Sequence, residues 1–178
     1  YTSGKWKEQG LLICNEIHPA RAKILSENVE RMGIANAMVT NESPQRLAEV
    51  FEDYFTRILV DAPCSGEGMF RKNEAACEEW NPENVSLCAE RQDGILDCAA
   101  SMLAPGGRIV YSTCTFAPAE NEGSMTRFLL RHPEFRIVEV KKADGMSAGV
   151  PEWAYFGEEK GQVLPEIAQT IRLWPQHL

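Results

Sequence analysis

Two apolar runs that each lead to a cysteine constrain the fold of this chain more than any other feature. Residues 57–61 lead through Ala-Pro to Cys64, and residues 108–112 lead to Cys114. Each run has the apolar, β-branched composition of a buried strand and then breaks into a turn of small polar residues. Because ligands bind outside the carboxyl ends of the strands in an open α/β sheet, the two thiols are predicted to face one pocket.

The rest of the chain predicts an α/β fold in which strands and helices alternate. Strands are expected at residues 10–16, 36–40, 57–61, 108–112, 135–140 and 167–173, and helices at 19–32, 44–51, 82–103 and from 118 onward. Such alternation indicates a mostly parallel sheet with helices on both faces, and 178 residues are expected to form one domain. Residues 62–80 and 141–161 are expected to be loops, and a connection as long as 62–80 is often functional.

Capping signals and apolar spacing predict the ends and the inner faces of the helices. Gly33 is expected to end the first helix, and Ser43 to cap the second, with Pro44 at its first position. The inward faces are expected to comprise Leu47, Val50 and Phe51 in the second helix, and Cys88, Gln92, Ile95, Leu96, Ala99, Met102 and Leu103 in the third.

Charge and cysteine spacing argue against several function classes. A net charge of −8 argues against a large nucleic-acid surface, which is normally basic. None of the six cysteines forms a Cys-x-x-Cys pair and the three histidines are scattered, so no metal site is expected. No apolar run approaches the ~18–20 residues that span a bilayer, and no signal peptide is evident. We therefore expect a cytoplasmic chain with free thiols and no membrane partner.

Four residues at predicted strand ends are candidates for chemistry, and each has a plain structural alternative. Cys114, next to a predicted helix start, could be an activated nucleophile or a buried core cysteine. Asp61 could accept hydrogen bonds from a ligand amine or act as an acid or base. Otherwise it simply forms a turn, with Cys64 an inert thiol. Glu16 could hold ribose hydroxyls, although a lone acid at a strand end is weak evidence.

Three motifs along the chain carry a resemblance to a known family. They are Asp-Ala-Pro-Cys-Ser-Gly-Glu-Gly-Met-Phe-Arg-Lys at 61–72, Arg-Gln at 91–92, and Pro-Gly-Gly-Arg-Ile-Val-Tyr-Ser-Thr-Cys-Thr-Phe at 105–116 with Glu-Asn-Glu at 120–122. These motifs resemble the Sun/Fmu family of RNA cytosine-5 methyltransferases, in particular its bacterial ribosomal RNA branch. The similarity extends from about Gly10 to Pro175, and the paired cysteine motifs are far more specific than a lone glycine-rich loop.

The resemblance implies a Rossmann-like class I methyltransferase sheet and a reaction through a covalent adduct. Cys114 matches the nucleophile that attacks carbon 6 of a flipped-out cytosine, Asp61 the residue that contacts the base, and Cys64 the thiol that helps to expel the methylated product. Thiolate addition at carbon 6 moves electron density to carbon 5, which can then attack the sulfonium methyl group of S-adenosylmethionine. The base must leave its stack to reach these groups.

The resemblance and the loop composition also suggest residues that bind the cofactor and the RNA. The candidates are Glu16 for the ribose of S-adenosylmethionine, Asn41 and Glu42 for its adenine end, Asp61 at both the cofactor and the base, and Phe70, Arg71 and Lys72 for RNA stacking and phosphate contacts. The expected RNA is small-subunit ribosomal RNA. For residues 70–72 a solvated loop is the alternative.

Three parts of the family pattern are missing from the sequence. The glycine-rich loop that cradles the methionine end of the cofactor, the strand before it and the family's basic RNA-docking parts are not found, and the last absence would explain the charge of −8. We therefore expect residues 1–178 to be a partial methyltransferase domain that by itself binds the cofactor weakly or not at all. The alternatives are an inactive fragment that serves in binding or assembly, a tRNA-directed enzyme of the same family, and a Rossmann-like enzyme that acts on a small molecule or a protein thiol.

Overall fold

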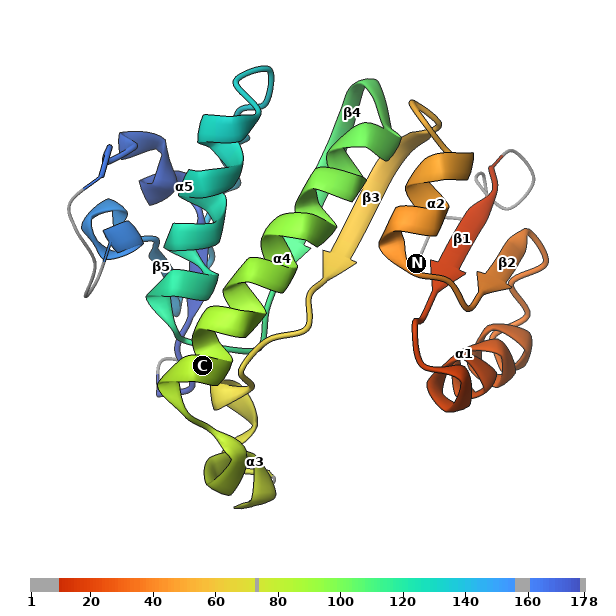
Figure 1. Ribbon diagram of the computed structural model, residues 1–178, viewed down its shortest axis with the longest axis horizontal. Helices are drawn as coiled ribbons and strands as arrows, with labels where there is room; N and C mark the ends of the chain where they lie inside the picture. Colours follow the sequence, from red (N-terminus) through yellow and green to blue (C-terminus); the bar gives the residue numbers. More distant parts are fainter. Residues whose placement is uncertain (1–9, 73, 156–160, 177–178) are drawn as a thin grey trace. The chain divides into compact units, whose positions relative to one another are not determined.

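The computed structural model describes residues 10–72, 74–155 and 161–176, and these residues form a mixed α/β fold (Figure 1). The chain divides into two compact units, Tyr1–Glu52 and Asp53–Leu178. The first contains β1 (Leu12–Asn15), α1 (Pro19–Arg31), β2 (Ala37–Thr40) and α2 (Pro44–Val50). The second contains β3 (Phe55–Asp61), η2 (Glu67–Met69), α3 (Glu74–Glu79), α4 (Pro82–Met102), β4 (Leu103–Ser112), η3 (Pro118–Glu120), α5 (Glu122–Arg131), β5 (Met146–Ala148), η4 (Pro151–Tyr155), η5 (Pro165–Gln169) and β6 (Ile171–Leu173), where η denotes a 3-10 helix.

In the first unit, β1 and β2 pair in parallel, so their carboxyl ends lie at one edge. Their register runs from Leu12 opposite Ala37 to Asn15 opposite Thr40. Helix α1 connects the two strands and contacts β2. It ends as predicted, because Gly33 takes up the left-handed conformation, with φ of 64°, that glycine adopts most readily.

Helix α2 begins as the sequence predicts but does not bury the predicted face. Ser43 caps it, since its hydroxyl oxygen accepts the N–H of Arg46 at 3.3 Å, and Pro44 follows at the first helical position. The prediction that Val50 points inward is wrong, because its side chain is 68% exposed. The helix has only 7 residues and no buried side chain, so apolar spacing over such a short segment is a weak guide to burial.

The second unit is built on the parallel pair β3–β4 and the long helix α4. Residue Ile58 lies opposite Ile109, and Asp61 lies opposite Ser112, so the two strands end at the same edge. Helix α4 packs along both strands (Figure 1). The core between them comprises Val60, Ala62 and Ala99, with Ile58, Ile95, Ile109 and Tyr111 packed against it.

Only one face of the β3–β4 pair is covered by the described residues of this unit. Leu59 is 72% exposed and Val110 is 52% exposed, so the expectation that these two runs form buried strands holds for one face only. Successive side chains in a strand point to opposite faces, and α4 covers the face that carries Val60.

The described strands pair into three two-stranded sheets. Strands β1–β2 and β3–β4 are parallel, and β5–β6 is antiparallel. The predicted strand at 135–140 is wrong, since Phe135 packs against Phe128 and His132 outside any strand. The predicted strand at 167–173 is shortened to β6 because η5 precedes it, and β4 begins five residues earlier than expected. The predicted loop at 62–80 contains η2 and α3, and the predicted loop at 141–161 contains β5 and η4.

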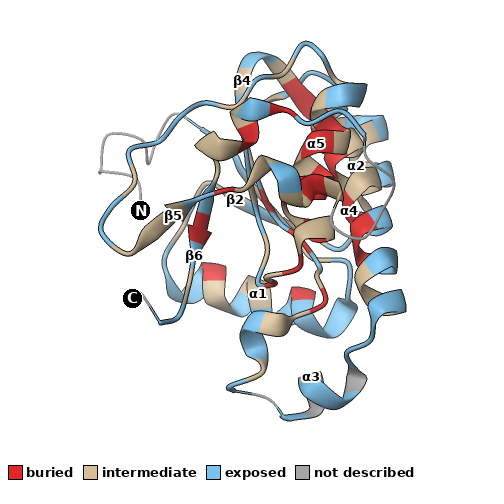
Figure 2. Cartoon of the chain, turned by 90° about the vertical axis from the view of Figure 1, so that its left-hand side faces the viewer, coloured by how far each residue is buried: buried red, intermediate tan, exposed pale blue. Residues whose placement is uncertain are grey.

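A buried ion pair joins β6 to α5 in the second unit. Arg172 Nε donates to Glu122 Oε1 at 2.7 Å, and a second guanidinium nitrogen contacts the other carboxylate oxygen. The guanidinium also lies 5.0 Å from the ring centre of Trp153 and 5.2 Å from that of Trp174. Figure 2 shows buried residues on α4, α5 and β6. The loss of either charged partner would leave a buried charge without compensation.

Membrane-spanning helices and clusters of metal ligands are both absent from the described residues. None of their helices combines the length and the apolarity needed to cross a bilayer. Nor do three or more histidine, cysteine or acidic side chains gather there as metal ligands would.

Candidate active site

Two free thiols meet at the carboxyl ends of β3 and β4. Cys64 lies three residues after β3 and Cys114 two residues after β4, and their sulfur atoms are 2.9 Å apart. The backbone N–H of Cys114 also donates to Sγ of Cys64 at 3.3 Å. The parallel pairing of the strands therefore delivers both thiols to one point.

Both thiols line one pocket of about 310 Å³, as the strand-end argument predicts. Its other walls come from the turn after β3, from η2, from α3 and α4, and from the connection between these two helices: Ser65, Gly66, Met69, Ala76, Trp80 and Asn84. The indole N–H of Trp80 donates to Glu67 Oε1 at 3.1 Å, which fixes the ring relative to η2. The pocket lies at the small end of the range in which proteins bind small molecules.

The two thiols differ in their surroundings. Burial, followed by the hydrogen bond with Cys114, raises the pKa of Cys64 to about 12. Cys64 is therefore a neutral thiol at neutral pH and can donate its S–H. Cys114 is exposed. The two sulfur atoms are 2.9 Å apart, close enough for the Cys64 S–H to be donated to Sγ of Cys114.

Gln92 and Glu120, whose side chains are both fully buried, hold the turn that carries Cys64. Nε2 of Gln92 donates to the carbonyl oxygen of Pro63 at 2.9 Å and to Oε2 of Glu120 at 2.7 Å. The same carboxylate oxygen accepts the N–H of Ser65 at 3.0 Å. The residues on both sides of Cys64 are thus anchored, and burial raises the pKa of the Glu120 carboxyl.

Further hydrogen bonds join this network to the turn that carries Cys114. The hydroxyl oxygens of Ser65 and Thr115 are 2.9 Å apart, and the Tyr111 hydroxyl donates to Oε1 of Gln92 at 2.9 Å. The sequence interpretation did not identify this network as part of the site. The available signal was Gln92, a polar residue in an otherwise apolar stripe of α4.

Gly68 supports the Cys114 turn because it has no side chain. Its N–H donates to the carbonyl oxygen of Cys114 at 2.8 Å, and a Cβ atom on Gly68 would lie 2.6 Å from that same oxygen. The neighbouring Glu67 accepts the N–H of Phe116 at 3.0 Å through Oε2. Helix η2 therefore fixes the backbone on both sides of Thr115.

Gly68→Ala is expected to displace the Cys114 carbonyl and to lower the free energy of unfolding by about 1–3 kcal/mol. Gly94 in α4 offers a matched control, because nothing lies within 4 Å of a Cβ atom built there. Gly94→Ala should instead raise the free energy of unfolding by about 0.5–1 kcal/mol. Urea unfolding of both variants measures the difference, and equal stabilities would show that the clash at Cys114 does not occur.

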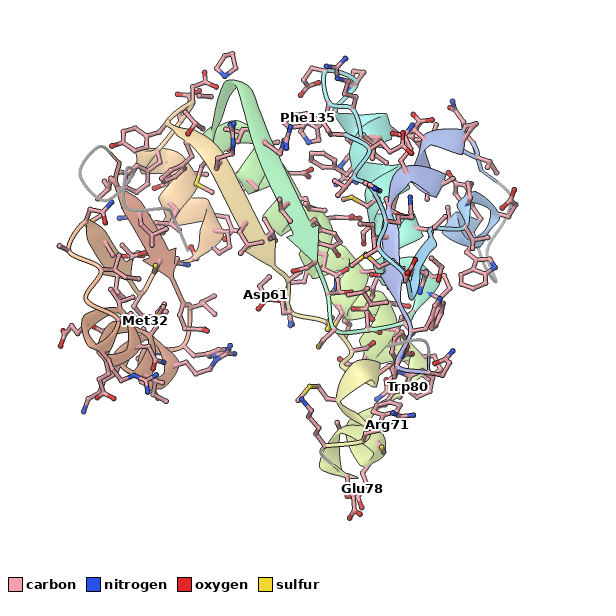
Figure 3. All side chains as sticks on the ribbon, turned by 180° about the vertical axis from the view of Figure 1, so that it is seen from behind. Met32, Asp61, Arg71, Glu78, Trp80 and Phe135 are labelled. Carbon is pink, nitrogen blue, oxygen red and sulfur yellow. The ribbon has the colours of Figure 1, made fainter. Side chains whose placement is uncertain are left out.

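Asp61 ends β3 at the same edge but does not line the thiol pocket. The backbone beside it is fixed, since the N–H of Ala62 donates to the carbonyl oxygen of Ser112 at 2.9 Å. Figure 3 shows Asp61 at the end of the strand, where it is exposed. Within the part of the chain that the structure describes, its carboxylate has no recorded partner, so a ligand group at this edge could reach it.

The three residues predicted to contact RNA follow η2. Phe70 and Arg71 line a second pocket of about 450 Å³, whereas Lys72 lines neither pocket. Figure 3 labels Arg71 and Trp80 in the region of η2 and α3. The segment between β3 and α4 therefore contributes side chains to both pockets.

In the first unit, Glu16, Asn41 and Glu42 come together just after β1 and β2. The side-chain amide of Asn41 donates to the carbonyl oxygen of Glu16 at 2.6 Å. The side-chain amide of Asn15 donates to the carbonyl oxygen of Glu42 at 2.9 Å. These cross-links hold the predicted cofactor residues at the carboxyl edge of the parallel pair.

The Glu16 carboxylate can bind the expected cofactor only if its oxygens can accept further hydrogen bonds. One oxygen accepts the N–H of His18 at 3.0 Å, and the other pairs with Arg21 at 2.9 Å. Each oxygen thus has one recorded donor, and a carboxylate oxygen can accept two. A carboxylate beside side-chain amides at a strand end suits ribose hydroxyls. The residues present therefore fit the nucleoside half of S-adenosylmethionine.

The matching family model and two curated relatives of this chain are ribosomal RNA methyltransferases by name. The family model described as 16S rRNA methyltransferase RsmB/F matches residues 2–178. Ribosomal RNA small subunit methyltransferase F of Shewanella denitrificans is 41% identical over 125 residues, which are 70% of this chain and 25% of that protein. The protein of the same name from Cronobacter sakazakii is 37% identical over 161 residues, 90% of this chain and 33% of its own length. The chain thus spans about a quarter to a third of these relatives.

A solved structure has a similar fold over most of this chain. The crystal structure of NSun6 from Pyrococcus horikoshii with SFG aligns with 91% of this chain and 39% of that one. The TM-score is 0.62 at 26% sequence identity.

Proposed function

The chain belongs to the 16S rRNA methyltransferase RsmB/F family, and we propose that the protein containing it methylates carbon 5 of a cytosine in small-subunit ribosomal RNA. The observation that carries this proposal is the pair of free thiols, 2.9 Å apart, in one pocket. Methyl transfer to nitrogen or oxygen needs no enzyme nucleophile, whereas an unreactive ring carbon must first be activated. We assign residues 1–178 to the methyltransferase catalytic domain.

Cys114 is the proposed nucleophile. Its thiolate adds to carbon 6 of a cytosine that has left the base stack, and carbon 5 becomes electron-rich as a result. The exposure of Cys114 and the thiol donor on Cys64 support this role. Bound S-adenosylmethionine supplies the methyl group for carbon 5.

Cys64 is the proposed release group. Once carbon 5 carries the methyl group, a water molecule from the solvent accepts its remaining proton. The C–H electron pair forms the double bond between carbons 5 and 6, and Sγ of Cys114 leaves as a thiolate. Cys64 is protonated at neutral pH and lies within hydrogen-bond distance of the departing sulfur. Donation from its S–H stabilises the leaving thiolate.

The remaining predicted site residues have binding roles in this proposal. Asp61 contacts the target base and borders the cofactor, Glu16 holds the ribose hydroxyls, and Asn41 and Glu42 border the adenine. Phe70, Arg71 and Lys72 contact the RNA strand. Free thiols persist in a reducing compartment, which favours the cytoplasm.

The test is methyl transfer by the protein expressed from its complete gene. It is incubated with small-subunit ribosomal RNA and S-adenosylmethionine labelled in the methyl group, and the RNA is digested to nucleosides. We expect the label in 5-methylcytidine at one position, located by mass spectrometry of RNA fragments. Label in another nucleoside would contradict the cytosine assignment, and RNA binding without transfer would favour a role in assembly.

A further inference from the structure

The second pocket shares a wall with the thiol pocket. It is lined by Glu67, Gly68, Phe70, Arg71, Phe116, Trp174, Pro175 and Gln176 and has a volume of about 450 Å³, within the range of small-molecule sites. Helix η2 contributes Met69 to the thiol pocket and Glu67 to the second one. A ligand in the second pocket would therefore lie next to the proposed reaction.

Aromatic rings form one side of this second pocket. Phe116 and Trp174 stack with their ring centres 5.3 Å apart and their planes 19° from parallel. The buried guanidinium of Arg172 lies 5.2 Å from the Trp174 ring, so the stack is tied to the core. Phe70 adds a third ring from the loop after β3. Such a lining suits a flat, apolar group that can stack.

Arg71 brings a positively charged group to the same pocket. The pocket's other charged side chain, Glu67, already accepts the N–H groups of Trp80 and Phe116. The Arg71 side chain is exposed, and the described residues provide no recorded ion pair or hydrogen bond for the guanidinium. It is therefore available to an anion, and an arginine guanidinium binds phosphate well. A flat base joined to a phosphate matches both the rings and the charge, because nucleic-acid sites combine aromatic stacking with cationic contacts.

The backbone places this pocket close to the reacting thiol. Phe116 lies two residues after Cys114, so their Cα atoms are at most about 7 Å apart. Glu67 and Gly68, which line the second pocket, hydrogen-bond to Phe116 and Cys114 respectively. A nucleotide bound here would thus belong to the strand segment around the target.

We infer that the second pocket binds the base and phosphate of a nucleotide that flanks the target cytosine in the RNA substrate. This inference rests on the proposed function and adds a subsite to it. The subsite fixes the register of the strand relative to Cys114, because its walls are hydrogen-bonded to the turn that carries this thiol.

The first part of the test compares variants of the pocket. Phe70→Ala should raise the KM for RNA roughly 5- to 150-fold, since base stacking on an aromatic side chain has about that value, and Phe70→Trp should restore it. Arg71→Gln should also raise the KM. Arg136→Gln removes an exposed charge that lines neither pocket and should leave the KM within about two-fold.

The second part identifies the bound group by a double-mutant cycle. RNA substrates that lack one base at each position around the mapped cytosine are tested with the wild type and with Phe70→Ala. At one flanking position, the missing base should raise the KM of the wild type as much as Phe70→Ala does, and should not affect the variant further. Additive losses at every position, with an active wild type, would overturn the subsite alone. A wild type that methylates no RNA would overturn the proposed function and the subsite together.

Discussion

Replacing Cys114 by serine is expected to lower the rate of methyl transfer to RNA by a factor of about 10³ or more. Serine has nearly the same size and shape, but its hydroxyl stays protonated at neutral pH and is a far weaker nucleophile. The Cys64 donor 2.9 Å away cannot compensate, because it stabilises a thiolate that serine does not provide. RNA binding should persist, since this substitution leaves the second pocket unchanged.

Single-turnover measurements with enzyme in excess over RNA isolate this chemical step. Cys77→Ser is the matched control: this free thiol in α3 is exposed and lines neither pocket, so full activity is expected. A Cys114→Ser variant that keeps its rate within ten-fold of the wild type would remove the covalent mechanism. A matching loss in Cys77→Ser would point instead to a general sensitivity of the fold.

The convergence of the two thiols could be predicted because its signals are local. An apolar, β-branched run followed by Pro63 and Gly66 predicts a strand and then a turn. When two such strands pair in parallel, their carboxyl ends lie at the same edge of the sheet. Ser43 and Gly33 likewise act on neighbouring backbone groups. Helix α2 begins just after Ser43 and α1 ends before Gly33, as predicted. Local chemistry of this kind needs no knowledge of the rest of the fold.

The support beneath the thiols could not be predicted because it depends on contacts between distant residues. Glu120 binds the backbone of Ser65 across 55 positions of sequence. From the sequence, Glu120 is placed only within a family motif, which assigns no partner to its carboxylate. The sequence also could not predict which face of a strand or helix is buried, because elements elsewhere in the chain cover that face. Leu59 and Val50 are expected from the sequence to be buried, but both are exposed.

Because Cys64 lies so close to Cys114, replacing Cys64 is expected to affect product release rather than attack. Cys64→Ala should still allow Cys114 to attack, because the nucleophile is intact. Release should slow by about 10² or more, the usual contribution of a positioned acid or base. A covalent complex between the protein and RNA should therefore accumulate. Cys64→Ser, which keeps a hydroxyl donor at the same place, should accumulate less of it.

The complex is detected as a slowly migrating band on a denaturing gel, with labelled RNA and with S-adenosylmethionine present. The double variant Cys64→Ala/Cys114→Ser is the control, and it should form no such band, because the bond is made through Sγ of Cys114. If Cys64→Ala turns over normally without a band, Cys64 has no part in release, and the 2.9 Å contact serves only to favour the thiolate. If the double variant forms the band, the adduct is on another residue and Cys114 is not the nucleophile. These two gels therefore distinguish attack by Cys114 from release by Cys64.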